Sequence, residues 1–339
     1  MVGGRDLAKG QSLAAELDGR VSAAYVDAFD ARLLDEFCSR CSIVLNCAGP
    51  VSGLRDRVAQ AAFRARCHYI DLAGLSFVME SMLPLAPKIA ELGLSFVVSA
   101  GWMPGLSELL PIHAYLQAKT KTDAIDSVTV YFGDSGEWSA NALRDAVFYL
   151  RQRGIRRPTH FHKGERVPAK MSEGLTKVTL GERLGQLHFS MLSTDEQNEM
   201  GRRLSDCDVF TYAYLPGLHT AMAGSLIALL PLPEVLTVRL LGNAWRGNRL
   251  PVGGFVVARV LGRAQGRSVE VTAQIVFEKG QDYWINGLVM ASVARMVAEG
   301  KGVRTGVHFL SDAVAPAAFM EELRKAGVER TENFRACES

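Results

Sequence analysis

The sequence predicts an α/β protein in which a doubly wound parallel sheet is interrupted by an α+β second domain of mostly antiparallel strands. Two observations predict this fold class. The first hundred residues alternate apolar strand-like runs with helical patterns joined by short links, which is typical of parallel strands connected by helices. From residue 126 onward, strand-like runs follow one another with longer polar links, as in antiparallel sheets. The 339 residues are enough for two domains of ordinary size.

The elements of the parallel half follow from apolar runs and their period. Strands are expected at residues 21–25, 42–47, 68–72 and 95–99, and helices at 31–39, 54–66 and 81–92. The run 42–47 is almost entirely apolar, as expected for a strand whose two faces are both covered by helices.

The second half contains strand-like runs that are not separated by helices. These runs are residues 127–132, 235–241, 254–261 and 268–277, and the last two are joined by a hairpin-type link. Residues 285–299 return to a helical pattern that Gly300 and Gly302 end. We therefore expect a discontinuous parallel domain, residues 1–120 and 284–339, with an inserted substrate or dimerisation domain at residues 121–283.

Composition narrows the class of protein. A net charge of +2 with interleaved acids and bases gives no reason to expect nucleic acid as a partner. The longest apolar run, residues 221–230, is shorter than the roughly 20 residues of a membrane span, so we expect a buried or lid helix there. Six cysteines without a signal-peptide pattern indicate free thiols and a cytoplasmic protein. A small-molecule substrate is expected, and a homodimer is left open.

The opening residues have the pattern of a strand end that turns into a helix. Gly3 and Gly4 permit a sharp turn, and Arg5 follows at the mouth of the helix. In dinucleotide-binding folds an acid at this position binds the ribose 2′-hydroxyl of NAD, whereas a nearby arginine accepts the 2′-phosphate of NADP. The sequence therefore predicts NADP as the cofactor. A Rossmann-like domain also has a first strand, a glycine-rich turn and a helix before this point, about 25–35 residues, so we expect a truncated N-terminus.

Three predicted strands end in loops that contain glycine. These loops are residues 46–50, 71–74 and 99–105, and the first and last also contain proline. In an open parallel sheet, ligands bind outside the carboxyl ends of the strands, and a glycine lets the backbone approach a ligand closely. Glycine and proline also end strands that bind nothing. We predict a ligand site because three such strand ends follow the strand that ends at Arg5.

These segments resemble the saccharopine dehydrogenase family. The family has stretches of the types V-(I/L)-N-x-A-G-P, Y-x-D-x-x-G-E and G-x-x-P-G-L-S. The similar segments here are residues 44–50, 69–74 and 101–107, together with the opening Gly4-Arg5-Asp6 and the tail 306–319. The likeness is strongest over residues 1–115. Two departures are that Leu75 replaces the glutamate of the second stretch and that G-x-G-x-x-G is missing. The near-match Gly300-x-Gly302 follows a helix and is interpreted as a helix cap.

The resemblance implies an NADP-dependent oxidoreductase that transfers hydride at a C–N bond of an amino-acid-derived substrate. It implies that Arg5 and Lys9 hold the 2′-phosphate and that Asp27 lies near the adenine. The further cofactor-binding residues it implies are Asn46, Ala48, Gly49, Pro50, Asp71, Ala73, Gly74, Trp102, Pro104 and Gly105. No residue is identified as the catalytic proton donor. Two alternatives stay open: a trans-acting enoyl reductase-like enzyme on a lipid-like chain, and a non-catalytic NADP-binding or scaffold protein.

Two further patterns are typical of metal or redox sites, but each lacks a necessary part. Cys38-x-x-Cys41 has redox spacing without a second pair or a thioredoxin-like context. His160 and His162 would share one face of a strand, but no third ligand is near in sequence. We therefore expect packing cysteines and no metal.

Overall fold

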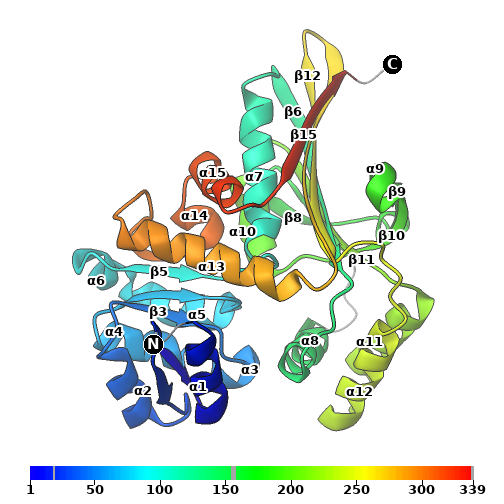
Figure 1. Cartoon of the computed structure of the whole chain (residues 1–339). Coiled ribbons are helices and arrows are strands. Elements are labelled where there is room, and N and C mark those ends of the chain that lie inside the picture. Colours follow the sequence, from blue (N-terminus) through cyan, green and yellow to red (C-terminus); the bar gives the residue numbers. More distant parts are fainter. Residues whose placement is uncertain (18–19, 154–157, 337–339) are drawn as a thin grey trace.

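The structure, a computed structural model, describes residues 1–17, 20–153 and 158–336. It contains a parallel part with helices around it and a large, mostly antiparallel sheet (Figure 1). The predicted α/β fold class, with parallel strands and a mixed second sheet, is confirmed.

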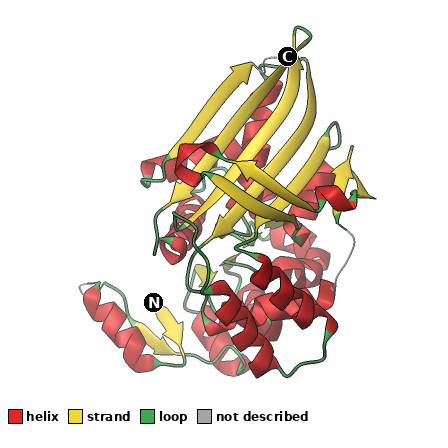
Figure 2. Ribbon diagram, turned by 90° about the vertical axis from the view of Figure 1, so that its right-hand side faces the viewer, coloured by secondary structure: helices red, strands yellow, loops and turns green. Residues whose placement is uncertain are grey.

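The parallel strands form two separate sheets. One is the pair β1 (Val2–Gly4) and β2 (Ala23–Tyr25), which are joined through α1 (Leu7–Glu16). The other has the order β14-β5-β4-β3, with β3 at Ile43–Asn46, β4 at His68–Asp71, β5 at Ser95–Val98 and β14 at Gly306–Phe309. Among the described residues no ladder joins β1 to β3. The unit of β1, α1 and β2 consequently lies beside the rest of the parallel part (Figure 2).

Helices cover this part of the molecule as the alternating pattern predicts. They are α2 (Ala31–Cys38), α3 (Val51–Leu54), α4 (Arg57–Arg64), α5 (Leu75–Met82), η1 (Leu83–Leu85) and α6 (Ala86–Glu91). Asp30 caps α2 by accepting hydrogen bonds from the Arg32 and Leu33 backbone. Tyr69 and Phe96 are fully buried between the strands and helices, with ring centroids 5.4 Å apart.

The second sheet has nine strands. Its order is β15-β13-β12-β6-β11-β10-β9, and β7 and β8 extend it beside β11. The bounds are β6 Ala124–Asp134, β7 Thr159–His162, β8 Glu165–Pro168, β9 Leu175–Thr179, β10 Gln186–Met191, β11 Asp208–Tyr214, β12 Gly254–Ala264, β13 Arg267–Phe277 and β15 Arg330–Ala336. Only the pairing of β6 with β11 is parallel among the described ladders of this sheet.

One predicted strand of this half is a helix. Residues 235–241 lie in α12 (Glu234–Trp245), which packs with α8 (Ala140–Arg153) and α11 (Leu218–Leu229). The run of valine and leucine suggested a strand, but Thr237 and Leu241 are the buried positions, one helical turn apart. Burial of Leu241 against Val147 and Ile227 decides the structure here, because packing overrides local propensity.

The C-terminal segment connects the two parts. Helix α13 (Asp282–Ala298) packs on β3 and β4, and β14 pairs in parallel with β5. The division into domains stays a prediction, but its last stretch needs a correction. Residues 330–336 form β15, which pairs along its whole length with β13 in the nine-stranded sheet.

The remaining helices pack on the large sheet, connect its strands, or lie between it and the parallel part. They are α7 (Leu106–Lys119), α9 (Gly181–Leu184), α10 (Asp195–Arg203), α14 (Leu310–Ala313), α15 (Pro316–Lys325) and the short η2 (Met171–Glu173). Helix α7 packs on β6, β12 and β13. In the part of the chain that is described, no helix combines the length and apolarity needed to cross a membrane.

Candidate functional site

The loop that follows β3 is exposed and is held in shape by the asparagine that ends the strand. The Asn46 side chain donates to the Tyr69 hydroxyl at 3.1 Å and accepts from the Ala48 backbone at 3.1 Å. Cys47 and Ala48 are exposed, and Gly49 and Pro50 are half-buried. This strand end is therefore open to a ligand, as the sequence predicts for parallel sheets.

Helix α8 contacts the same loop from the second part of the chain. The Asn141 side chain donates to the Gly49 carbonyl at 2.8 Å. Asp145 accepts from the backbone of Val51 and Ser52, each at 2.9 Å, and from the Ser52 hydroxyl at 2.7 Å. A protein carboxylate thus occupies the backbone donors that follow Pro50, so these donors do not face an open cofactor site.

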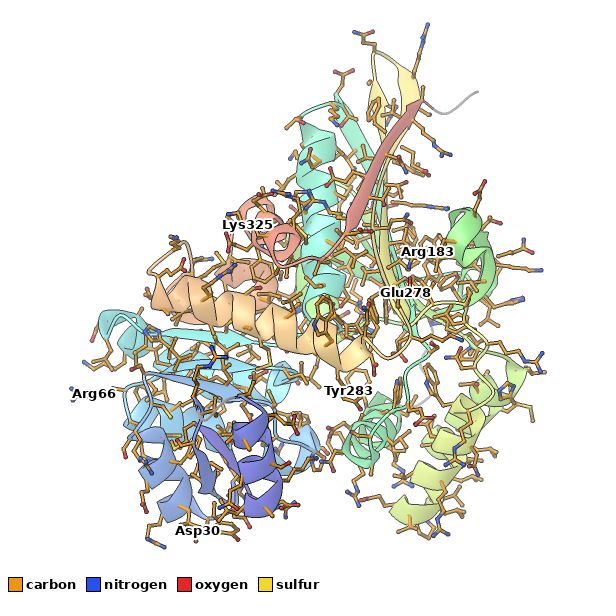
Figure 3. The ribbon with its side chains drawn as sticks, in the orientation of Figure 1. Asp30, Arg66, Arg183, Glu278, Tyr283 and Lys325 are labelled. Carbon is orange, nitrogen blue, oxygen red and sulfur yellow. The ribbon has the colours of Figure 1, made fainter. Side chains whose placement is uncertain are left out.

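The segment between β6 and α8 is held by hydrogen bonds at its first and last residues. Asp134, the last residue of β6, is buried and accepts from the Gly136 backbone at 3.1 Å and the Trp138 indole at 2.9 Å. Burial, together with the nearby Asp282 carboxylate, raises the pKa of Asp134 to about 7. The Ser139 backbone donates to the hydroxyl of Tyr283 at 3.1 Å. Figure 3 shows Tyr283 at the start of α13, directly above α8.

A cavity of about 450 Å³ lies between the β3 loop and helices α8 and α12. Its lining residues are Pro50, Ser52 and Gly53 from the loop and α3, Arg144, Val147, Phe148 and Arg151 from α8, and Glu234 from α12. Arg144 Nε lies 3.1 Å from Glu234 Oε1, and Arg151 donates to the Leu232 carbonyl. The cavity therefore contains two guanidinium groups beside an apolar wall, and each has N–H donors beyond those bonded to Glu234, Asn141 and Leu232. Such a lining suits a carboxylate on a short carbon chain.

The β4 end is organised by Asp71, which is buried. Its Oδ1 accepts from the Ser99 backbone at 2.9 Å and from the Gly74 backbone, whereas Oδ2 has no partner among the described residues. Burial raises the pKa of Asp71 to about 6. A Cβ added at Gly74 would overlap the Asp71 carboxylate, so this glycine is required for the close approach of the loop. Contact of Asp71, Ala73 or Gly74 with a cofactor stays a prediction.

Two further buried acids lie near the β5 end, and sequence reasoning missed both. Ser99 donates to Glu196 Oε1 at 2.6 Å, and Glu108 accepts from the Gly105 backbone and the Ser107 hydroxyl, each at 2.6 Å. Burial raises the pKa of both glutamates, and the charge of Glu196 adds to the effect on Glu108. A signal for Glu108 was its place within an apolar helical run. Glu196 reaches the site from α10, and the sequence around it contains no comparable signal.

The predicted residues of the β5 loop lie in the core. Trp102 is 5% exposed, its ring contacts Phe277 with centroids 5.4 Å apart, and its backbone donates to Asn286 at 2.8 Å. Pro104 and Gly105 are buried as well. The structure therefore groups these three residues beneath the loop surface, apart from the cavity-lining residues.

The β1 end presents an exposed arginine. Arg5 and Lys9 are exposed, and neither side chain has a hydrogen bond or ion pair to a described residue. Asp6 is engaged as the cap of α1, because it accepts from the Lys9 backbone at 2.9 Å. Asp27 likewise accepts from the Phe29 backbone at 3.0 Å. An unpaired guanidinium at a strand tip, with the neighbouring acid engaged, fits the 2′-phosphate of NADP.

The fit to the cofactor's pyrophosphate is weaker. The described residues contain no G-x-G-x-x-G turn between a strand and a helix. Gly300 and Gly302 have φ values of 63° and 65° directly after α13, so they end that helix, as the sequence predicts. The residues present therefore fit the ribose-phosphate end of the cofactor best.

The cysteine and histidine patterns differ in their surroundings. Burial raises the pKa of the Cys38 thiol to about 12, and Cys67 donates to the Cys41 carbonyl at 2.8 Å. His162 contacts Asp208 at 2.7 Å, while His160 stacks on Phe210. No group of three or more metal-binding side chains is present in the described residues.

Comparison with known proteins identifies a family and a fold that the chain resembles. Residues 1–97 match the family described as the saccharopine dehydrogenase NADP binding domain. The chain shares the fold of apo saccharopine dehydrogenase (L-Glu forming) from Saccharomyces cerevisiae, with a TM-score of 0.67 and 14% identity over 98% of this chain and 93% of that chain. These findings confirm the predicted resemblance, the Rossmann-like fold and an NADP-binding domain.

Other solved structures are less similar. A probable dehydrogenase from Thermotoga maritima has a TM-score of 0.48 and 8% identity over 97% of this chain and 90% of that chain. An oxidoreductase domain protein from Kribbella flavida has a TM-score of 0.42 and 12% identity over 99% of this chain and 89% of that chain. No curated protein sequence matches the chain.

Proposed function

We propose that this NADP-binding dehydrogenase-like protein transfers hydride at a C–N bond of an amino-acid-derived substrate bound between α3 and α8. The observation that carries the proposal is the cavity with Arg144 and Arg151 in its wall. The two arginines are seven residues apart on α8, roughly two helical turns, so they lie on the same face. Guanidinium groups bind carboxylates through paired hydrogen bonds, and an amino-acid-derived substrate carries such groups.

The chain's own residues bind and orient the substrate and the cofactor. Arg5 holds the 2′-phosphate, and Arg144 and Arg151 hold the substrate carboxylates. Val147 and Phe148 form the apolar wall against which the carbon chain of the substrate packs. When bound, the nicotinamide supplies or accepts the hydride. Asn141 and Asp145 keep α8 against the β3 loop. The arginines of α8 therefore stay at a fixed distance from the carboxyl end of β3.

The cavity lining favours this substrate over a lipid-like chain. Two arginines and one glutamate line it, and burying an acyl chain against these charges would leave them poorly solvated. The apolar segment 221–230, whose side chains would suit a lipid-like substrate, contributes no lining residue. The enoyl reductase is therefore the second candidate.

The test is turnover of chemically graded substrates by the full chain. Formation or loss of NADPH is followed with saccharopine, with N-linked amino-acid conjugates that carry fewer carboxylates, and with an enoyl thioester. We expect turnover of the carboxylate-rich conjugates. Removal of one charge-assisted contact costs about 1.5–3 kcal/mol. Arg144→Gln and Arg151→Gln should therefore raise KM by roughly ten- to a hundredfold.

The matched control is Arg239→Gln, an exposed arginine of α12 that does not line the cavity. It should leave KM unchanged. Turnover of the enoyl thioester alone would favour the second candidate. NADPH binding without turnover of any substrate would favour a scaffold protein, and an unchanged KM in both cavity variants would remove the arginines from the substrate site.

A further inference from the structure

Helix α11 carries an apolar stripe that faces away from the rest of the chain. Leu218, Met222, Leu226 and Leu229 recur every three or four residues and so lie on one face of the helix. Their exposed fractions run from 42% at Leu226 to 76% at Leu218. Leu230, Val235 and Leu236 continue the exposed apolar area into the start of α12. We call these seven residues the α11 surface.

The stripe is additional to the face that α11 already buries. Thr220, Ala223 and Ile227 are the buried positions of the helix, and Ile227 packs with Val147 of α8 and Leu241 of α12. Apolar side chains that continue beyond the buried face of a surface helix, in a patch of this extent, are typical of an interaction site. The α11 surface therefore has the composition of a covered face, although no part of the described chain covers it.

The position of the helices leaves this face accessible. Figure 1 places α11 and α12 at the margin of the molecule, with α8 between them and α3. In Figure 2 the same helices lie on the side turned toward the viewer. A neighbouring molecule could approach this margin without meeting the large sheet or the unit of β1, α1 and β2.

The size of the surface fits an interface between two molecules. The seven side chains are on average just over half exposed. With the surface area of typical apolar side chains, they expose roughly 400 Å² of apolar surface. Two copies would then bury about 800 Å² of apolar area, close to the apolar share of a standard-size protein–protein interface of about 1,600 Å². The largest apolar patches on monomers are about 300–600 Å² and are often functional.

The charge pattern favours a second copy of this chain over a lipid surface. Residues 218–233 contain no lysine, arginine, aspartate or glutamate, and the charge of Glu234 at the border of the surface is paired with Arg144. Helices that lie on membranes usually carry basic residues beside their apolar face, and α11 has none. A neutral face can meet its own copy about a two-fold axis without opposing like charges.

Small residues of α11 assist close approach of two helices. Gly224 and Ser225 lie between the apolar ridges, Ser225 is exposed, and no atom lies within 4 Å of a Cβ placed at Gly224. Ridges of one helix pack into grooves of another when such gaps are present. We infer that the protein forms a two-fold homodimer in which the α11 surfaces of two copies pack against each other.

The test is the mass of the full chain in solution across a dilution series, measured by light scattering and sedimentation equilibrium. We expect a species of twice the chain mass. The double variant Leu218→Glu, Leu229→Glu places acids of both copies in one interface, where like charges repel strongly. We expect it to raise the dissociation constant by about a hundredfold or more and to leave a monomer. Circular dichroism and the thermal midpoint establish that the variant is folded.

The matched control is Leu175→Glu, because Leu175 is 63% exposed, as Leu229 is 66% exposed, but lies on β9 outside the α11 surface. This variant should remain dimeric. A monomeric parent, or a folded double variant that stays dimeric, would overturn the inference. A monomeric parent that sediments with vesicles of phosphatidylcholine and phosphatidylserine would identify a lipid surface as the occupant. None of these outcomes depends on turnover, so the test is independent of the proposed function.

Discussion

Replacing Asp134 with asparagine should remove most of the pH dependence that this residue gives to stability. Asp134 is 5% exposed and lies where β6 leads into the helix that forms the cavity wall. Its pKa rises from the ordinary value of 3.8 to about 7 in the folded protein, because the ionised carboxylate loses water and lies near Asp282. The folded state therefore binds the proton more tightly than the unfolded state does.

The sign and the size follow from this difference. The contribution is fully present below the unfolded pKa and is lost as the pH rises through the folded pKa. A rise from 3.8 to about 7 corresponds to a loss of about 4 kcal/mol once the carboxylate is ionised. Asparagine keeps an oxygen that accepts from Gly136 and Trp138 but cannot ionise. Asp134→Asn should therefore gain stability relative to the parent between about pH 4 and pH 8.

The assay is denaturant unfolding of parent and variant over that pH range. The informative quantity is how the difference in the free energy of unfolding between variant and parent changes with pH. Any pH-independent cost of the amide cancels in this change. The control is Asp126→Asn at the opposite, exposed end of β6, which pairs with Arg263 at 2.7 Å. Its effect should stay below about 1 kcal/mol. Parallel curves for parent and Asp134→Asn would refute the reasoning.

Three further changes test the contacts around the strand ends. Glu196→Gln should raise the thermal midpoint more at alkaline than at acid pH, because burial raises the pKa of this glutamate and ionisation destabilises the fold; an equal change at both would contradict this. Gly74→Ala should destabilise by about 1–3 kcal/mol in chemical unfolding, because its Cβ would overlap Asp71, whereas Gly4→Ala, with open space around it, should cost less. Asp145→Ala should cost about 1–3 kcal/mol, since two backbone donors lose their acceptor; a neutral result would show that α8 is held by other contacts.

The parallel strands and their ends could be predicted because their signals are local. Alternating apolar runs located β3, β4 and β5, and glycine-containing loops marked their carboxyl ends. The hairpin of β12 and β13 was visible as two strand-like runs separated by a short glycine-containing link. In each case the residues that determine the structure are close together in sequence.

The contacts that build the cavity could not be predicted, because they join distant residues. The bonds from Asp145 to Val51 and Ser52 span more than ninety residues, and nothing in either segment indicates the other. The valines and leucines of run 235–241 suit a strand as well as a helix, and the sequence predicted a strand. Packing of α12 against α8 and α11 favours the helix. Trp102 follows the glycine that ends a predicted strand and is named there as a cofactor-binding residue, but nothing in the local sequence indicates that its ring packs in the core beside Phe277.

The most direct test of the account is titration of the full chain with NADPH and with NADH, together with an Arg5→Ala variant. Arg5 is exposed and has no partner among the described residues, so its charge is available to a 2′-phosphate. A charge-assisted contact of about 1.5–3 kcal/mol predicts that the parent prefers NADPH by roughly ten- to a hundredfold. Arg5→Ala should lose that preference, whereas Arg32→Ala, an exposed arginine of α2 that faces Glu36 at 3.8 Å, should keep it. A variant that binds NADPH as tightly as the parent would contradict the role of Arg5, and a parent that binds neither nucleotide would contradict the NADP-dependent function.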